Sequence, residues 1–356
     1  MSDKFKEFTV DRIVAESAVI SSFYLTPKTS LKRKFVPGEY LLFEYRGDGR
    51  EHVRREYSIS GQKGETIRVT IKHETAPDSQ LPDGLVSTHF HKHLEVGDIV
   101  HAAGPAGKFL LDRDSDRDVV LLSGGVGLTP MVAMAHELVD SSQQQTHFIH
   151  ACENGHVHAM GDEMRGLAKK HAHFQTHFVY RQPDSDDLLG KDYQSEGFVT
   201  QELLDKLLIK ADCDYYLCGP PPFMQAMYLL LQDMGVPSVQ IRYEFFGPAT
   251  VLKSNESVAG VALKPTPEEG GDTTNIIFAK SQMTVAWDGV SDNLLEFAEE
   301  QGLMVDFSCR AGTCDSCKTA VLQGEVSYPE APFEMPPEGF ALLCCSVPNG
   351  NLELDI

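Results

Sequence analysis

Short runs in which apolar and polar residues alternate fill the first third of the chain. Residues 8–14, 17–25, 40–45 and 66–72 alternate in this way, and turn residues separate them. A period of two places apolar side chains on one face of a strand and polar side chains on the other. A series of such strands predicts an antiparallel barrel over residues 5–112.

From about residue 113 the pattern changes to apolar runs followed by helical spacing. Residues 118–122 are typical of a buried parallel strand, and a glycine-rich turn at 123–130 leads into a helical pattern at 131–138. Further strands are expected at 147–150, 174–180 and 214–218. Alternating strands and helices predict an α/β nucleotide-binding domain with a parallel sheet.

A polar stretch with two prolines and paired glycines then predicts a flexible linker at 251–273. A hairpin at 275–287 and a helix at 293–300, with Ser291 or Asp292 as its N-cap, follow. The chain is therefore expected to be multidomain. The predicted order is a barrel domain (1–112), an α/β domain (113–250), the linker, and a small α+β β-grasp domain with a mixed sheet (274–356).

Four cysteines near the C-terminal end form the most specific chemical pattern. Cys309, Cys314 and Cys317 have the spacing C-x4-C-x2-C, and Cys344 follows after 26 intervening residues. Plant-type ferredoxins hold a [2Fe–2S] cluster with thiolates at this spacing. Zinc ribbons usually have two C-x2-C pairs, whereas this chain has one, and disulfides are rare in reducing compartments. The pattern therefore predicts a [2Fe–2S] cluster.

The fourth ligand must be chosen between two neighbours, Cys344 and Cys345. Residues 340–348 resemble the ferredoxin pattern aromatic-x-L-x-C-x-x-x-P, and Pro348 then favours Cys344. Neighbouring side chains of a strand point to opposite faces, so we expect Cys345 to be an ordinary buried thiol.

The charge is strongly negative and uneven. The formal net charge is −21, which argues against nucleic acid as a partner. Residues 266–356 carry 16 Asp and Glu against 3 Lys and Arg, a net charge of −13. This excess fits either simple solubility or electrostatic steering to a basic surface on a partner protein. No apolar run approaches the roughly 20 residues of a transmembrane segment, and the first residues lack a signal core, so a cytoplasmic location is expected.

Two short motifs in the first domain resemble the flavin-binding signatures of the ferredoxin–NADP reductase superfamily. The first is Arg55-x-Tyr57-Ser58, preceded by a segment that ends at Tyr40. The resemblance implies that Arg55 contacts the flavin phosphates, that Tyr57 packs on the isoalloxazine ring, and that Ser58 hydrogen-bonds near flavin N5. It makes Tyr40 a candidate for contact with the ribityl or adenine side.

The second motif is Gly84-x-Val86-Ser87, which precedes a short helix. A glycine and a hydroxyl group before a helix N-terminus predict an anion site, in agreement with the family's binding of a flavin pyrophosphate there.

The α/β domain carries matching nicotinamide-binding motifs. A strand followed by a glycine turn and a helix is an arrangement that binds a pyrophosphate. The turn has the superfamily's G-x-G-x-T-P form, with Gly125, Gly127, Thr129 and Pro130 at the named positions. Cys218, Gly219 and Pro220 resemble its C-G-P-x-x-[FM]-M segment. The resemblance implies that Cys218 lies beside the nicotinamide C4 atom.

The end of this domain resembles that of flavohaemoglobin reductase domains, a likeness that covers residues 5–250. It implies that Phe246 covers the flavin and that Glu244 supports the nicotinamide pocket. Because residue 5 already begins the barrel, neither a globin domain nor a haem dioxygenase activity is expected.

Together the modules predict an NADH:acceptor oxidoreductase that passes electrons from NADH to FAD and then to the [2Fe–2S] cluster. Catalytic roles fall to Ser58, Cys218 and Glu244. FMN is the alternative to FAD as the flavin. NADPH is the alternative to NADH, although Glu153 is placed to repel the 2′-phosphate of NADPH. The expected partner is a redox protein such as an oxygenase, a desaturase or a hybrid-cluster protein. The alternatives are a stand-alone reductase of small acceptors and a redox-sensing module.

Overall fold

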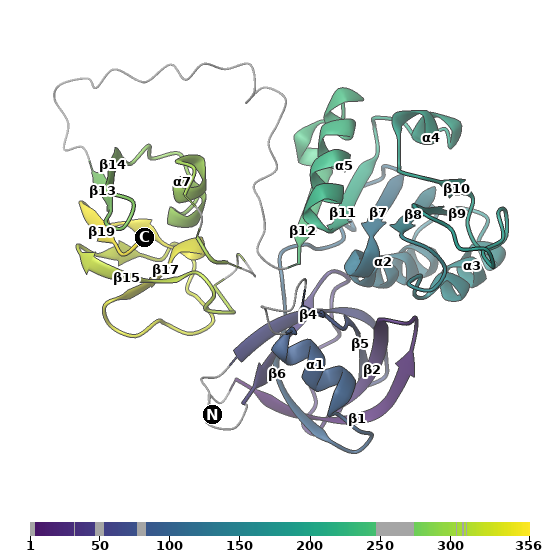
Figure 1. The fold of residues 1–356 in the computed structure, drawn as a ribbon, viewed down its shortest axis with the longest axis horizontal. Coiled ribbons are helices and arrows are strands. Elements are labelled where there is room, and N and C mark those ends of the chain that lie inside the picture. Colours follow the sequence, from purple (N-terminus) through teal and green to yellow (C-terminus); the bar gives the residue numbers. More distant parts are fainter. Residues whose placement is uncertain are drawn as a thin grey trace. The chain divides into compact units, whose positions relative to one another are not determined.

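The structure is a computed structural model that describes residues 4–31, 33–46, 53–76, 83–246, 274–303, 305–307, 310 and 312–356. The predicted linker and the predicted ligand Cys309 lie outside these ranges. The described residues up to Phe246 form one unit, and those from Thr274 onward form a second (Figure 1).

The first domain is a closed barrel of antiparallel strands, as the alternating pattern predicts, in the order β1-β2-β5-β4-β3-β6. The strands are β1 (Lys6–Ala15), β2 (Ile20–Pro27), β3 (Tyr40–Tyr45), β4 (Val53–Lys63), β5 (Thr66–Lys72) and β6 (Ile99–Ala106). Helix α1 (Leu85–Lys92) lies against the barrel and buries Phe90. The Phe90 ring centroid is 5.0 Å from that of Phe23 and 5.1 Å from that of Phe43, so α1 closes the barrel core.

The second domain contains a parallel sheet in the order β10-β9-β8-β7-β11-β12. The strands are β7 (Val119–Gly124), β8 (Thr146–Cys152), β9 (Phe174–Tyr180), β10 (Ser195–Glu196), β11 (Asp214–Gly219) and β12 (Ile241–Phe245). The chain runs outward from β7 to β10 and returns to β11 beside β7. Ligands of open α/β sheets bind outside the carboxyl ends of the strands at such a reversal point.

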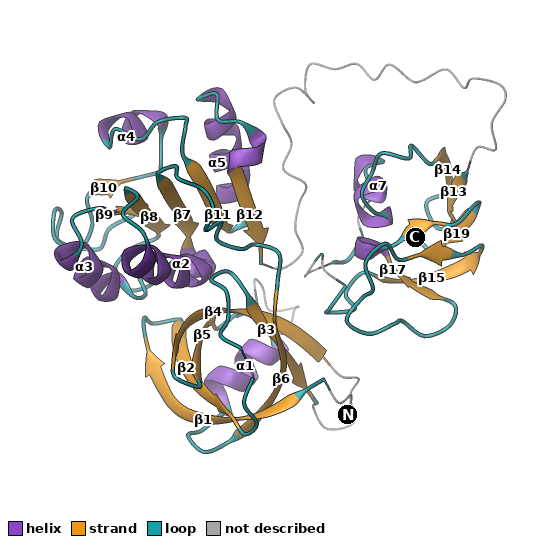
Figure 2. Cartoon of the chain, turned by 180° about the vertical axis from the view of Figure 1, so that it is seen from behind, coloured by secondary structure: helices purple, strands orange, loops and turns teal. Residues whose placement is uncertain are grey.

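Helices cover both faces of this sheet (Figure 2). Helices α2 (Leu128–Ser141) and α3 (Gly161–Lys170) lie on one face, and α4 (Gln201–Lys206) and α5 (Pro221–Asp233) lie on the other. Strand β7 buries Leu121 in the first apolar cluster and Val120 in the second. Its residues are apolar without interruption because both faces are covered. Within the described ranges, no helix has the length and apolar character needed to cross a membrane.

A charged cluster joins the barrel to the parallel-sheet domain. Arg68 of β5 donates to both carboxylate oxygens of Glu163 on α3 at 2.7 and 2.9 Å, and His136 Nε2 lies 2.6 Å from the same carboxylate. Burial alone would raise the pKa of Glu163, but hydrogen bonds from His136 and Arg68 lower it to about 2. Glu163 is therefore ionised at neutral pH, and the bidentate pair fixes the orientation of the two domains.

The C-terminal unit is a small mixed sheet in the order β14-β13-β19-β15-β17, in which β13 and β19 are parallel. The strands are β13 (Asn275–Phe278), β14 (Met283–Ala286), β15 (Lys318–Gln323), β17 (Phe340–Leu342) and β19 (Leu352–Leu354), with β16 (Val326–Ser327) and β18 (Val347–Pro348) paired separately. Helix α7 (Leu294–Glu300) buries Leu295 and Phe297 in the core of this unit. The predicted multidomain fold class is confirmed.

The predicted N-cap of α7 is wrong. The cap is Asn293, whose side-chain oxygen accepts the N–H of Glu296 at 3.0 Å. Ser291 instead donates its hydroxyl to Asp288, so it stabilises the preceding turn. The backbone N–H of Asp292 donates to the carboxylate of Glu296 at 3.1 Å, which makes Asp292 the partner of a first-turn glutamate.

Candidate functional site

The three residues predicted to be catalytic meet where the barrel faces the parallel sheet. Strands β11 and β12 pair in parallel with Cys218 opposite Glu244, at the carboxyl edge of the sheet. Ser58 of barrel strand β4 is buried, and its side chain hydrogen-bonds to the Glu244 carboxyl. Residues from both domains therefore form one polar group beside the reversal point of the sheet.

Burial makes this group uncharged at neutral pH. Burial and the nearby charge of Glu56 raise the pKa of Glu244 to about 8, against the hydrogen bond from Ser58. Burial, together with the carboxylate form of Glu244, raises the pKa of the fully buried Cys218 thiol well above its ordinary value. Glu244 Oε2 has no hydrogen-bond partner among the described residues. Glu244 is thus a neutral acid with one carboxyl oxygen that makes no hydrogen bond within the described residues, and Cys218 is a neutral, fully buried thiol.

The residues predicted to bind the flavin lie on β3 and β4 next to Ser58. Tyr40 pairs with Ser58 across the two strands and is buried. The ring centroids of Tyr57 and Phe43 are 5.7 Å apart. Burial raises the pKa of the Tyr57 hydroxyl. Arg55 has an exposed side chain on the same strand face as Tyr57. An exposed guanidinium beside a half-buried ring fits a flavin with its phosphates.

The predicted anion site at the start of α1 is formed by backbone groups. Gly84 is the N-cap, and no side chain caps the helix. The Ser87 hydroxyl donates to the Gly84 carbonyl at 3.0 Å and accepts the Glu74 N–H at 3.2 Å, so it holds the loop. Val86 is buried in the barrel core. The uncapped N–H groups of the first turn fit a phosphate, as FAD would supply.

The two nicotinamide-binding loops are in direct contact. A Cβ atom on Gly127 would lie 2.6 Å from the Gly219 nitrogen and still closer to the Cys218 carbonyl oxygen. Only glycine allows this approach. Gly125 has φ +53° and open space around it, and α2 starts without a capping side chain. This loop therefore offers backbone N–H groups to a pyrophosphate.

Thr129 and Pro130 lie in the first turn of α2 and are buried, so they position the loop. Pro220 is the N-cap residue of α5. Phe246 is half-buried against the apolar cluster that contains Cys218. Its predicted role as a cover over the flavin stays a prediction.

The ferredoxin-type cysteines Cys314, Cys317 and Cys344 are buried in the second unit. The Gly312 N–H donates to the Cys344 sulfur at 3.3 Å. The described residues contain no group of three His, Cys, Asp or Glu side chains around a single metal position. A binuclear cluster divides four thiolates between two irons, and the fourth cysteine lies outside the described residues. Buried thiols with backbone N–H donors fit a [2Fe–2S] cluster.

Sequence reasoning missed two residues. One is Glu56, which lies two residues before Ser58 on β4. The two side chains share a strand face, so strand alternation is a signal that could have identified Glu56 as a neighbour of the site. Arg181 follows β9, and its guanidinium lies 3.4 Å from the carboxylate of Glu153, which follows the neighbouring strand β8. Only the order of the strands reveals that pair.

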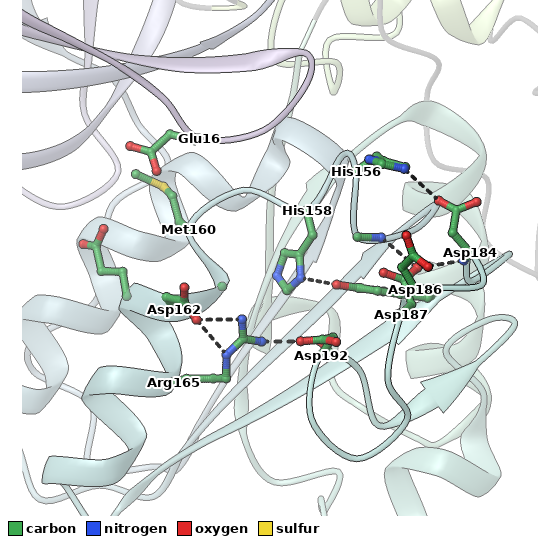
Figure 3. A pocket seen from close by; sticks show the side chains of 14 residues that line it. Glu16, His156, His158, Met160, Asp162, Arg165, Asp184, Asp186, Asp187 and Asp192 are labelled. Atoms are coloured by element: carbon green, nitrogen blue, oxygen red, sulfur yellow. Dashed lines mark hydrogen bonds and ion pairs between the residues drawn. The ribbon is translucent and has the colours of Figure 1, made fainter.

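A separate acidic hollow of about 390 Å³ lies over the ends of β8 and β9 (Figure 3). Asp162, Asp184 and Asp192 line it, and Glu16 enters from the barrel. Arg165 pairs with Asp162 at 3.0 Å. The excess of carboxylates disfavours phosphate groups, so the hollow is not expected to hold the dinucleotide.

Three families match consecutive parts of the chain. Residues 7–110 match the oxidoreductase FAD-binding domain, residues 121–228 the oxidoreductase NAD-binding domain, and residues 279–349 the 2Fe-2S iron-sulfur cluster binding domain. These matches confirm FAD, NADH and a [2Fe–2S] cluster as the cofactors.

Some similar proteins match only the first two domains of the chain, and others match all three. A flavohemoprotein of Bacillus thuringiensis is 38% identical over 253 residues, which are 70% of this chain and 62% of that protein. The FAD/NAD-binding domain of a nitric oxide dioxygenase from Vibrio cholerae is 33% identical, with a TM-score of 0.61, over 68% of this chain and 99% of that structure. The structure of phthalate dioxygenase reductase is 22% identical with a TM-score of 0.56, and covers 99% of this chain and 98% of that one. The last likeness extends the shared fold to all three modules.

Proposed function

Because the chain belongs to the ferredoxin–NADP reductase superfamily and carries a C-terminal 2Fe–2S domain, we propose that it is the reductase component of an electron-transfer system. It takes a hydride from NADH and passes single electrons to an external redox protein. When bound, FAD accepts the hydride and releases its two electrons singly, which a one-electron cluster requires.

The observation that carries this proposal is the hydrogen bond between Ser58 and Glu244, together with the pairing of Glu244 and Cys218 on neighbouring strands. Ser58 and Glu244 form a polar pair at the reversal point of the sheet, where a nicotinamide ring can reach a flavin held by Arg55 and Tyr57. A protonated Glu244 can donate a hydrogen bond to the nicotinamide carboxamide. Cys218 is fully buried, so its thiol is not in contact with solvent. These residues align the two rings, and positioning is the main requirement for hydride transfer.

We further propose an oxygenase, a desaturase or a hybrid-cluster protein as the acceptor class. One of the solved structures that cover 99% of this chain is phthalate dioxygenase reductase, described as a modular structure for electron transfer from pyridine nucleotides to [2Fe-2S]. The residue assignments for FAD, NADH and the cluster, and the domain limits at 112, 250 and 273, are part of the same proposal.

The rate of flavin reduction by NADH is expected to fall by about tenfold as the pH rises through about 8. The pKa of Glu244 is raised to about 8, so the group is a neutral donor below that pH and a carboxylate above it. The carboxylate cannot donate to the nicotinamide, and it repels the negative charge that arrives with the hydride. Stopped-flow absorbance over pH 6–10 measures the rate. The Glu244→Gln variant cannot ionise and should lose this inflection, and an unchanged inflection would contradict the role of Glu244.

Replacing Glu153 with glutamine should raise kcat/KM for NADPH by about tenfold and leave kcat/KM for NADH nearly unchanged. The carboxylate of Glu153 repels a 2′-phosphate and forms an ion pair with Arg181. Without that carboxylate, the Arg181 guanidinium can bind the 2′-phosphate instead. Steady-state kinetics with both nucleotides measures the change. Arg181→Gln in the same background should remove the gain, and a gain that survives without Arg181 would contradict this explanation.

The proposal itself is tested by NADH-driven reduction of cytochrome c as a one-electron protein probe, compared with reduction of a small quinone. A reductase component reduces the protein probe through its cluster, so removal of the cluster should stop that reaction selectively. Equal loss, or no loss, with the two acceptors would favour a stand-alone reductase of small molecules.

A further inference from the structure

Gly312, in the loop between the predicted ligands Cys309 and Cys314, is held from three sides. Its backbone N–H donates to the Cys344 sulfur at 3.3 Å, and its carbonyl accepts the Phe333 N–H at 2.9 Å. Its φ is +65°, in the left-handed region. A Cβ atom on Gly312 would lie 2.8 Å from the Cys345 sulfur and 3.0 Å from Pro332 Cβ. Cys345 and Pro332 therefore pack closely against the Cα atom of Gly312.

The direction of the Cys345 side chain differs from the prediction. Residues Leu343–Cys345 form a turn of 3₁₀-helix, η3, and not a strand, so Cys345 is not turned away from the loop that carries Cys314. The Cys345 thiol donates to the Leu342 carbonyl at 3.6 Å, and the Ser346 hydroxyl donates to the same carbonyl at 2.9 Å. These bonds fix the half-buried Cys345 with its sulfur against Gly312.

The position of the Gly312 N–H matters for the redox chemistry of a cluster. Reduction adds one negative charge, part of which resides on the thiolate sulfurs. A hydrogen bond to a sulfur strengthens as that charge grows, so it stabilises the reduced state and raises the reduction potential. Any side chain that keeps Gly312 in place therefore affects how readily the cluster accepts an electron.

We propose that Cys345 is a positioning residue for the [2Fe–2S] cluster: its side chain holds the Gly312 N–H on the Cys344 sulfur and so raises the reduction potential. Cys344 is the ligand, and Cys345 acts through Gly312. This inference deepens the proposed function, since a higher potential draws electrons from the flavin to the cluster. It rests on the cluster in that proposal and does not depend on the identity of the external acceptor.

The test uses the full-length holoprotein and its Cys345→Ala variant. The midpoint potential of the cluster is measured by anaerobic redox titration followed by electron paramagnetic resonance. We expect full cluster content and, at a fixed potential, an approximately tenfold lower ratio of reduced to oxidised cluster, which is about 59 mV for one electron. The Cys345→Ser variant, with a side chain closer in size, should show a smaller fall. Cys213→Ala, which removes a buried thiol from the other unit, should show no change.

A second variant keeps the inference falsifiable if Cys345→Ala is poorly folded. Gly312→Ala should disturb the cluster spectrum because its methyl group meets the Cys345 sulfur. Adding Cys345→Ala to it should restore part of the wild-type spectrum, as expected for residues in contact. Full cluster content with an unchanged potential in Cys345→Ala, or additive effects in the double variant, would overturn the inference. Loss of the cluster in Cys345→Ala together with its retention in Cys344→Ser would also overturn it, because Cys345 would then be the ligand.

Discussion

Replacing Cys317 with serine should remove the [2Fe–2S] cluster and reduce NADH-driven reduction of cytochrome c by about 100-fold or more. Cys317 is buried in the core of the C-terminal unit, where its sulfur is one of the four predicted ligands. The other unit contains the flavin and nicotinamide residues, so the rate of flavin reduction by NADH should be unchanged. Iron and labile-sulfide content, visible absorbance and stopped-flow rates measure the three quantities.

Cys213→Ala is the matched control for this substitution. Cys213 is 4% exposed and Cys317 is 3% exposed, so both substitutions remove a buried thiol. Cys213 lies in the parallel-sheet domain, where no cluster is expected, and its removal should leave iron content and cytochrome c reduction unchanged. Wild-type iron content in Cys317→Ser, or an equal loss in Cys213→Ala, would contradict the assignment of the cluster ligands.

Replacing Gly127 with alanine should lower the rate of flavin reduction by NADH by about 100-fold. The new methyl group would meet the backbone of Cys218 and Gly219, which cannot move aside as a side chain can. The loop at the start of α2 and the loop that carries Cys218 must then separate. A displacement of about 1 Å misaligns nicotinamide and flavin enough for such a loss, and overpacking should reduce the free energy of unfolding by about 1–3 kcal/mol.

Gly166→Ala on α3 is the control, because no heavy atom beyond its chain neighbours and the backbone of its own helix lies within 4 Å of its Cβ position. It should keep the wild-type rate and raise the free energy of unfolding by up to about 1 kcal/mol, since alanine is a better helix former than glycine. Stopped-flow kinetics and chemical denaturation measure both variants. A wild-type rate in Gly127→Ala would show that the contact between the two loops does not control the alignment.

The fold was largely predictable because its periodicities are strong. The predicted strands at 40–45, 66–72 and 174–180 have the bounds of β3, β5 and β9. Alternation identifies the barrel, and uninterrupted apolar runs identify strands covered on both faces. The N-cap of α7 was not predictable, since Ser291, Asp292 and Asn293 are all good capping residues and only the backbone selects among them.

The site was predictable only where a local motif carries it. Ser58 and Cys218 stand in recognisable motifs, but their meeting with Glu244 depends on the pairing of β11 with β12. The ion pair between Arg68 and Glu163 joins residues 95 positions apart that no local pattern connects. The orientation of Cys345 does not follow from strand alternation, because residues Leu343–Cys345 form a 3₁₀ turn.

An anaerobic titration of the holoprotein with NADH, followed by visible absorption, tests whether electrons pass from NADH through FAD to the cluster. FAD accepts two electrons and the cluster one, so full reduction should require about 1.5 equivalents of NADH per chain. The flavin band and the longer-wavelength iron–sulfur absorbance should both bleach. An end point at about 1 equivalent, with the iron–sulfur absorbance unchanged, would contradict electron transfer to the cluster. The protein would then be an NADH–flavin reductase only.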